Sequence, residues 1–209
     1  VNVDVNLNNY TISIDALKNV IENWRGPEKI KAIMPVHEFG CPVDMESVMS
    51  LSKKYDLYVI EDAACAIGCM YNNKKIGTIG DIGCFSFHPR KTITTGEGGA
   101  IVTNDDKLAD KIRRLRNHGI DIKNNEVNFV EPGWNYRLTN FQAALGRRQL
   151  ADLDNRICRR SEIVRYYCEL LESAHKSQCI HLPELISGHS FQTFMIVLND
   201  RYSRKKVIN

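Results

Sequence analysis

The chain has 209 residues, of which 43% are hydrophobic and 25% charged, the composition of an ordinary globular protein with room for one α/β domain and part of another. No stretch approaches the roughly 20 apolar residues that a membrane-spanning helix needs. The net charge of +3 is too balanced for a nucleic-acid-binding surface of clustered Lys and Arg, so neither a membrane nor a nucleic acid is an expected partner.

The chain begins with a pattern that is typical of a β-strand. Val1, Val3 and Val5 alternate with polar residues, as they do in a strand with one buried face. Because the chain starts at Val1 rather than at Met and enters this strand at once, we expect it to be a piece of a longer protein. Apolar residues then recur at helical spacing from Ser13 to Trp24, which predicts an amphipathic helix with Ser13 as its N-cap.

Strands and helices alternate over the next part of the chain. Residues 31–37 contain the apolar run AIMPV and predict a buried strand. A helix is predicted over residues 44–55, with the aspartate at its start as the cap, and residues 57–60 (LYVI) predict another buried strand that leads into Asp62. This alternation is typical of parallel β-α-β units, so it predicts an α/β fold with a mostly parallel sheet.

Two more short strands are predicted at residues 82–87 and 99–103, on either side of a loop rich in threonine and glycine. A helix follows from Asp105, whose negative charge suits a helix N-terminus, and it ends before Gly119. Residues 120–136 are mostly polar and predict a loop.

The last third of the chain predicts a long helix and a second domain. Thr139 and Gln142 predict a capping box at the start of a helix of about 30 residues, which is long enough to pass from one domain into another. The apolar run at residues 191–198 predicts a strand beyond this helix. We therefore expect an incomplete large domain in residues 1–150, and in residues 151–209 the linking helix and the start of a small α+β domain.

Three polar residues lie at or just after the carboxyl ends of predicted strands: Asp62, Ser86 and Lys91. In an open parallel sheet this is the edge at which ligands bind. Taken alone, Asp62 is also explained as a helix N-cap and Ser86 as a small core residue. Lys91 is harder to explain structurally, because it lies between a buried strand and a glycine-rich loop. A lysine at a desolvated site has an uncharged amine, which can form a Schiff base with an aldehyde.

The glycine-rich loop and the cysteines indicate no nucleotide-binding loop and no metal site. Residues 94–99 (TTGEGG) match neither of the glycine-rich phosphate-binding fingerprints, so the glycines are interpreted as positions of positive φ. The seven cysteines form no CxxC pair, and Cys65 and Cys69 are interpreted as packing residues. An odd number of cysteines is typical of reduced thiols in the cytoplasm, where we expect the protein to be.

Several stretches together resemble the DegT/StrS family of sugar aminotransferases. The matching segments are PVHEFGCPVDM, LYVIEDAACAIG, GDIGCFSFHPRKTITTGEGGAIVTNDD, LRNHG and GWNYRLTNFQAALGRRQL, in family order over most of residues 1–171. The resemblance implies the three-layer αβα sandwich of the aspartate-aminotransferase-like enzymes and pyridoxal 5'-phosphate as cofactor. It also implies transfer of an amino group from an amino acid, such as glutamate, to the keto carbon of a nucleotide-linked deoxysugar for cell-surface polysaccharide or glycoside biosynthesis, as in the perosamine-synthase-like members.

The resemblance also implies a role for each candidate residue. Lys91 holds the cofactor covalently and moves protons during the reaction, Asp62 faces the pyridine nitrogen, and Ser86 holds the cofactor phosphate. Asn135 matches the family asparagine that reaches the phosphate of the neighbouring subunit's cofactor, and Arg137 is close enough in sequence to join it. These matches imply a homodimer with shared active sites.

Two departures from the family and two other functions stay open. Cys65 stands where many relatives have a glutamine, glutamate or histidine near the cofactor's hydroxyl group. The family also has an additional N-terminal segment with a phosphate loop and a stacking aromatic, which we expect upstream of Val1. One alternative is a dehydratase of the same family, in which a histidine stands at the position of Lys91. The other is a regulator that binds the cofactor, or an inactive piece of such an enzyme.

Overall fold

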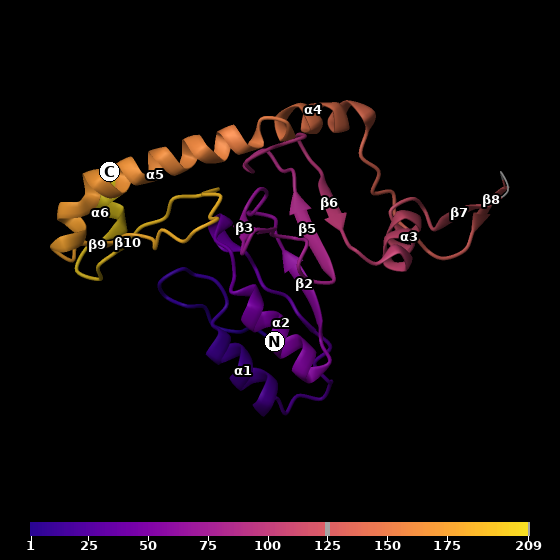
Figure 1. Cartoon of the computed structure of the whole chain (residues 1–209), viewed down its shortest axis with the longest axis horizontal. Helices are drawn as coiled ribbons and strands as arrows, with labels where there is room; N and C mark the ends of the chain where they lie inside the picture. Colours follow the sequence, from indigo (N-terminus) through magenta and orange to yellow (C-terminus); the bar gives the residue numbers. More distant parts are fainter. Residues whose placement is uncertain (124–125, 209) are drawn as a thin grey trace.

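The computed structural model describes residues 1–123 and 126–208. Its centre is a four-stranded sheet in the order β1-β2-β5-β6, in which β6 runs antiparallel to its neighbour and the other pairings are parallel (Figure 1). The strands of this sheet are β1 (Ala32–Ile33), β2 (Tyr58–Asp62), β5 (Ile82–Ser86) and β6 (Gly99–Val102). The smaller two-stranded sheets are β3 (Met70–Tyr71) with β4 (Lys74–Lys75), β7 (Ile120–Lys123) with β8 (Glu126–Phe129), and β9 (Ile180–His181) with β10 (Val197–Leu198).

The helices begin at polar caps where the sequence predicted them. Ser13, Asp44 and Asp105 each accept a hydrogen bond from a backbone N–H of the first turn, which removes an unpaired donor at the helix start. The helices are α1 (Ile14–Asn23), α2 (Met45–Tyr55), α3 (Asp106–Leu115), α4 (Asn140–Leu150), α5 (Leu153–Lys176) and α6 (Arg204–Ile208), with a short 3₁₀ turn η1 (Glu38–Gly40). None of the helices in the described part of the chain is long and apolar enough to cross a membrane.

The hydrophobic core lies between the sheet and helices α1 and α2, which cover one of its faces (Figure 1). Val48 of α2 and Val59 of β2 are fully buried there, and Leu17 is the buried residue of α1. The burial of β2 alternates along the strand, as expected for a sheet with one face in the core. This packing fixes the orientation of β2, and with it the side chains at the end of that strand.

Several predicted elements differ from the structure. The long helix is broken at residues 151–152, so that α4 and α5 are separate helices. Residues 120–123 and 126–129 form an antiparallel hairpin rather than a loop. The strand predicted at residues 191–198 is reduced to β10. No helix follows Asp62, where the chain forms turns instead.

Helix α5 leads away from the main sheet, and the C-terminal segments lie beside its far end (Figure 1). There β10 pairs with β9 in antiparallel register, with Val197 opposite His181, outside the four-stranded sheet. Arg160 of α5 donates from Nη1 to the carbonyl oxygens of Phe191 and Gln192, at 2.9 and 3.0 Å. These bonds hold the segment that returns toward the sheet against α5.

Candidate active site

The end of β2 presents two carboxylates to opposite sides of the sheet. Successive side chains of a strand alternate in direction, so Glu61 points into the core whereas Asp62 points to the other face. Glu61 is fully buried, whereas Asp62 is partly accessible. Of the two, only Asp62 is available to a ligand at the carboxyl edge of the sheet.

The buried Glu61 has a structural role that the sequence did not reveal. It receives a hydrogen bond from His37 Nε2 at 3.2 Å, and His37 Nδ1 accepts the backbone N–H of Val43 at 3.1 Å. Its two oxygens also accept three backbone N–H groups at 2.6–2.8 Å, from Gly77, Ile79 and Gly80. Burial by itself raises the pKa of Glu61, but these hydrogen bonds outweigh it and hold the pKa below its usual value. Glu61 therefore ties two loops to the end of β2.

Asp62 lies opposite Cys84 of β5 in the parallel register. Its Oδ1 accepts the backbone N–H of Ala64 at 3.0 Å, so it stabilises a turn in place of the predicted helix cap. The Asp62 charge also acts on the Cys84 thiol, whose pKa is raised by burial and, to a smaller extent, by that charge. The remaining carboxylate oxygen can accept a hydrogen bond from a ligand at this edge.

Ser86 is the last residue of β5 and lies two residues beyond Cys84, so both side chains face the same side as Asp62. Its hydroxyl accepts the backbone N–H of His88 at 3.3 Å and keeps its own proton for another acceptor. The structure therefore places Ser86 on the strand next to Asp62, at the carboxyl edge where β5 enters the loop to Lys91.

Lys91 reaches back from this loop to the segment that follows Asp62. Its Nζ lies 3.1 Å from Sγ of Cys65, and both side chains are partly buried. The turn after β2 and the loop after β5 thus meet. Cys65 lies three residues after Asp62 in that turn, and Lys91 lies five residues after Ser86 in that loop. Cys69 is fully buried, as the packing interpretation expects, whereas Cys65 is only partly buried and its thiol contacts the lysine amine.

The loop that contains Lys91 is held in place by α4, a relationship that the sequence did not indicate. The side-chain amide of Gln149 bonds both backbone groups of Thr94, with distances of 3.1 Å to its N–H and 2.6 Å to its carbonyl oxygen. Gln142 donates to the carbonyl oxygen of Glu97 at 2.9 Å. Gly96 and Gly98 have φ of +81° and +146°, which confirms the interpretation of these glycines.

Asn135 and Arg137 lie on the exposed segment before α4. Arg137 Nε donates to Asn135 Oδ1 at 2.8 Å, and Asn135 forms a β-bridge with Asn117 after α3. Among the described residues, neither Asn135 nor Arg137 forms a hydrogen bond with Lys91. Arg137 instead lines a cavity of about 1110 Å³ along β6, together with Gly98 and Gly99 from the end of the lysine loop.

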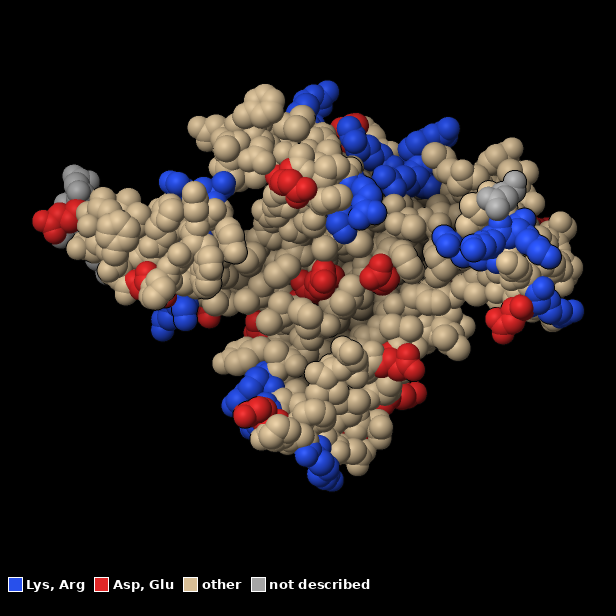
Figure 2. Space-filling model, turned by 180° about the vertical axis from the view of Figure 1, so that it is seen from behind, with Lys and Arg blue, Asp and Glu red and all other residues tan. Residues whose placement is uncertain are grey.

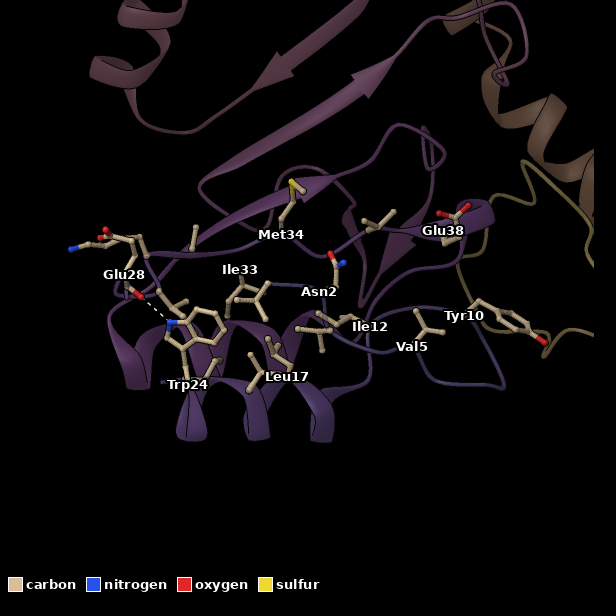
Figure 3. A pocket seen from close by; sticks show the side chains of 18 of the residues that line it. Asn2, Val5, Tyr10, Ile12, Leu17, Trp24, Glu28, Ile33, Met34 and Glu38 are labelled. Atoms are coloured by element: carbon tan, nitrogen blue, oxygen red, sulfur yellow. Dashed lines mark hydrogen bonds between the residues drawn. The ribbon is translucent and has the colours of Figure 1, made fainter. Parts of the chain in front are cut away.

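A second cavity, of about 920 Å³, lies apart from these residues (Figure 3). It runs between the outer side of β1 and the first residues of the chain, above α1, and its walls are mainly apolar. Leu17, Trp24 and Ile33 point into it, and Trp24 Nε1 donates to the carbonyl oxygen of Glu28 at 2.7 Å. Neither Lys91 nor any other candidate residue lines this cavity, so it is not part of the candidate active site.

The surface charge does not single out the Lys91 region either. On the face drawn in Figure 2, acidic side chains are scattered, whereas lysines and arginines gather mostly toward the half of the molecule that carries α5. The site is therefore defined by the convergence of two loops at the sheet edge rather than by a field of one sign.

Comparison with known proteins identifies the family. The model of the DegT/DnrJ/EryC1/StrS aminotransferase family matches residues 1–209. The chain belongs to this family. It is 46% identical to the GDP-perosamine synthase of Caulobacter vibrioides over 157 residues, which are 75% of this chain and 41% of that protein. The chain spans about half the length of the curated relatives it matches.

Solved structures show the same fold. A DegT/DnrJ/EryC1/StrS aminotransferase from Brucella abortus superposes with a TM-score of 0.87 at 32% identity, over 96% of this chain and 53% of that one. The GDP-4-keto-6-deoxy-D-mannose-3-dehydratase of E. coli, with bound hydrated pyridoxal phosphate, has a TM-score of 0.86 at 26% identity, over 99% of this chain and 56% of that one. The expected aspartate-aminotransferase-like αβα fold is thereby confirmed for this member of the DegT family.

Proposed function

We propose that this DegT-family chain is the central part of a pyridoxal-phosphate-dependent aminotransferase. It moves an amino group from an amino acid, such as glutamate, to the keto carbon of a nucleotide-linked deoxysugar in cell-surface polysaccharide or glycoside biosynthesis. The observation that carries the proposal is the position of Lys91, whose amine comes from the loop after β5 to within 3.1 Å of the turn that follows Asp62. The name of the perosamine synthase relative supports the sugar substrate.

The residues present fit pyridoxal phosphate by the chemistry of their donor and acceptor groups. Lys91 supplies an amine that can bind an aldehyde, Asp62 supplies a carboxylate with an uncommitted oxygen for a protonated ring nitrogen, and Ser86 supplies a hydroxyl proton for a phosphate oxygen. When bound, the cofactor supplies an electron sink for the carbon that loses or gains the amino group.

The protein's own part in the reaction is to position groups and to move a proton. With the cofactor bound, Lys91 would act as general base and general acid, moving a proton at the substrate carbon. Asp62 would hold the ring nitrogen of the cofactor and stabilise a positive charge there. Gln149 and Gln142 hold the loop so that the Lys91 amine stays at the sheet edge.

The dehydratase relative makes dehydration the second candidate function. The resemblance associates that reaction with a histidine at the position of Lys91. A lysine amine with four flexible methylene groups can both hold the cofactor and transfer protons, which favours amino transfer. Assay of both products from one keto-sugar substrate separates the two reactions.

We further propose that the protein acts as a homodimer with shared active sites, in the cytoplasm. Asn135 and Arg137 are exposed, and beside them the rings of Trp134 and Tyr136 stack with centroids 6.0 Å apart while remaining largely accessible. These features support a role for the segment at the cofactor phosphate of a second subunit. We also propose that residues 1–150 belong to the cofactor-binding domain, and residues 151–209 to the linking helix and the start of a smaller domain.

The proposal is tested by mapping the lysine that carries the cofactor. The protein as its gene encodes it is incubated with pyridoxal phosphate, reduced with borohydride and digested, and the modified lysine is identified by mass spectrometry. We expect the label on Lys91, and we expect Lys91→Ala to lose both the label and amino transfer, whereas the matched variant Lys75→Ala keeps both. A label on Lys74 or Lys75, or near-normal turnover of Lys91→Ala, would overturn the proposed function.

A further inference from the structure

The contact between Cys65 and Lys91 brings a thiol and an amine together without a carboxylate between them. Sγ and Nζ are 3.1 Å apart, although the two residues are 26 positions apart in the chain. Both side chains are partly accessible, so a small oxidant can reach them. We propose that hydrogen peroxide converts this pair into a reversible covalent sulfur–nitrogen link.

The link forms in two steps whose atoms and electrons balance. In the first step the Cys65 thiolate attacks one peroxide oxygen, so that an S–O bond forms, the O–O bond breaks, and the departing hydroxide takes up the proton that the thiol had released. Sulfur loses two electrons, peroxide is reduced, and the products are a sulfenic acid and water. In the second step the uncharged Lys91 amine attacks the sulfur, an S–N bond forms, and the S–O bond breaks with release of a second water. A thiol reductant restores both side chains.

Among the cysteines in the part of the chain that the structure describes, Cys65 is the one with a lysine amine within hydrogen-bond distance of its sulfur. Cys41 and Cys69 are buried, and desolvation raises the pKa of each thiol to about 12, which leaves them as unreactive thiols. Cys158 is exposed on α5, and its sulfur lies 4.0 Å from Oε1 of Glu162, a carboxylate that cannot form a sulfur–nitrogen link. Cys65 combines access for peroxide with an amine already in contact.

The link has a consequence that rests on the proposed function. A Lys91 nitrogen bonded to sulfur has no free amine to hold pyridoxal phosphate, so oxidation switches off cofactor loading and reduction restores it. The cofactor in turn protects the pair, because it occupies the Lys91 amine. Cys65 thus gives this family member a peroxide-sensitive site at the position where many relatives have a different residue.

The test is peptide mapping of the full chain, freed of cofactor and treated with hydrogen peroxide. Trypsin cuts after Lys54, Lys74, Arg90 and Lys107, and a modified Lys91 resists cleavage. We expect peptide 55–74 joined to an uncut peptide 91–107, lacking two hydrogen atoms relative to the reduced pair, and we expect reduction to separate them. Cys65→Ser and Lys91→Arg should abolish the joined species, whereas Cys158→Ser should keep it.

Two results would overturn the inference. One is a Cys65 that advances to sulfinic acid while Lys91 is still cut by trypsin, and the other is a disulfide from Cys65 to another cysteine. Cofactor loading is measured separately, by borohydride labelling before and after peroxide. A joined peptide without any labelling of the reduced protein would leave the link established and would contradict only the proposed function.

Discussion

Glu61 and Asp62 are neighbours in the chain, but they end β2 with carboxylates on opposite faces of the sheet. Glu61 is fully buried and pairs with His37, whereas Asp62 is partly accessible beside the turn that contacts Lys91. The first carboxylate holds the loops that support the strand end. The second is left free for chemistry, so the two residues have separable effects on stability and on activity.

Replacing the buried carboxylate tests its structural role. Glu61→Gln keeps the size of the side chain but replaces one carboxylate oxygen with an NH2 group. Backbone N–H groups that this oxygen accepted then lose their acceptor and face a donor instead. We expect a loss of about 3 kcal/mol in the free energy of unfolding, measured by urea denaturation. The matched control Glu172→Gln, which breaks an exposed ion pair with Lys176 on α5, should cost less than about 0.5 kcal/mol. Equal losses in the two variants would show that the Glu61 network contributes little.

Replacing the accessible carboxylate should affect the reaction rather than the fold. Asp62→Asn keeps an oxygen for the Ala64 N–H but removes the charge that faces the proposed ring nitrogen. We expect amino transfer to fall by about 100-fold or more, with thermal unfolding nearly unchanged. Asp56→Asn, at an exposed left-handed helix cap that asparagine tolerates, is the control and should retain activity. Normal turnover of Asp62→Asn would remove Asp62 from the site.

The loop that carries Lys91 should depend on Gln149. Gln149→Ala removes two hydrogen bonds to Thr94, which together stabilise the loop by about 1–2 kcal/mol. We expect faster amide hydrogen exchange confined to residues 92–98 and slower covalent labelling of Lys91 by the cofactor. Arg148→Ala, the exposed neighbour on α4, should change neither rate. Unchanged exchange in Gln149→Ala would show that the loop is held by its other contacts.

Acidification should destabilise the protein through His189. Burial lowers the pKa of this histidine from 6.5 to about 4, and its Nδ1 accepts the Phe191 N–H at 2.9 Å. Because the unfolded chain binds the proton first, stability from this group is complete above pH 6.5 and is lost as the pH falls toward 4, at about 1.4 kcal/mol per pH unit.

The matching variant is His189→Asn, which keeps an acceptor for the Phe191 N–H but does not titrate. We expect its unfolding free energy to fall less between pH 6.5 and 4.5 than that of the natural protein. Glu61 affects stability in a different pH range. Because its pKa is lowered from 4.5 in the folded protein, the stability that it contributes is lost only below pH 4.5. An identical slope in the variant would assign the loss above pH 4.5 to other groups.

The sequence alone determined the features that depend on neighbouring residues. The caps at Ser13, Asp44 and Asp105 and the strands around Val59 and Cys84 follow from local hydrogen bonding and from apolar periodicity, which act within a few positions of the chain. The order of strands and helices then fixed a mostly parallel sheet. The same local logic failed where a break or turn depends on packing, as between α4 and α5.

Only the tertiary structure decided which side chains meet. Lys91 contacts Cys65 across 26 positions, His37 bonds Glu61 across 24, and Gln149 bonds Thr94 across 55. Periodicity shows that a residue faces a core or a sheet edge, but it carries no information about which distant loop packs against it. These contacts arise because burying the apolar faces of α1, α2 and the sheet fixes the strand ends, and the loops then satisfy their polar groups with whatever the fold has brought within reach.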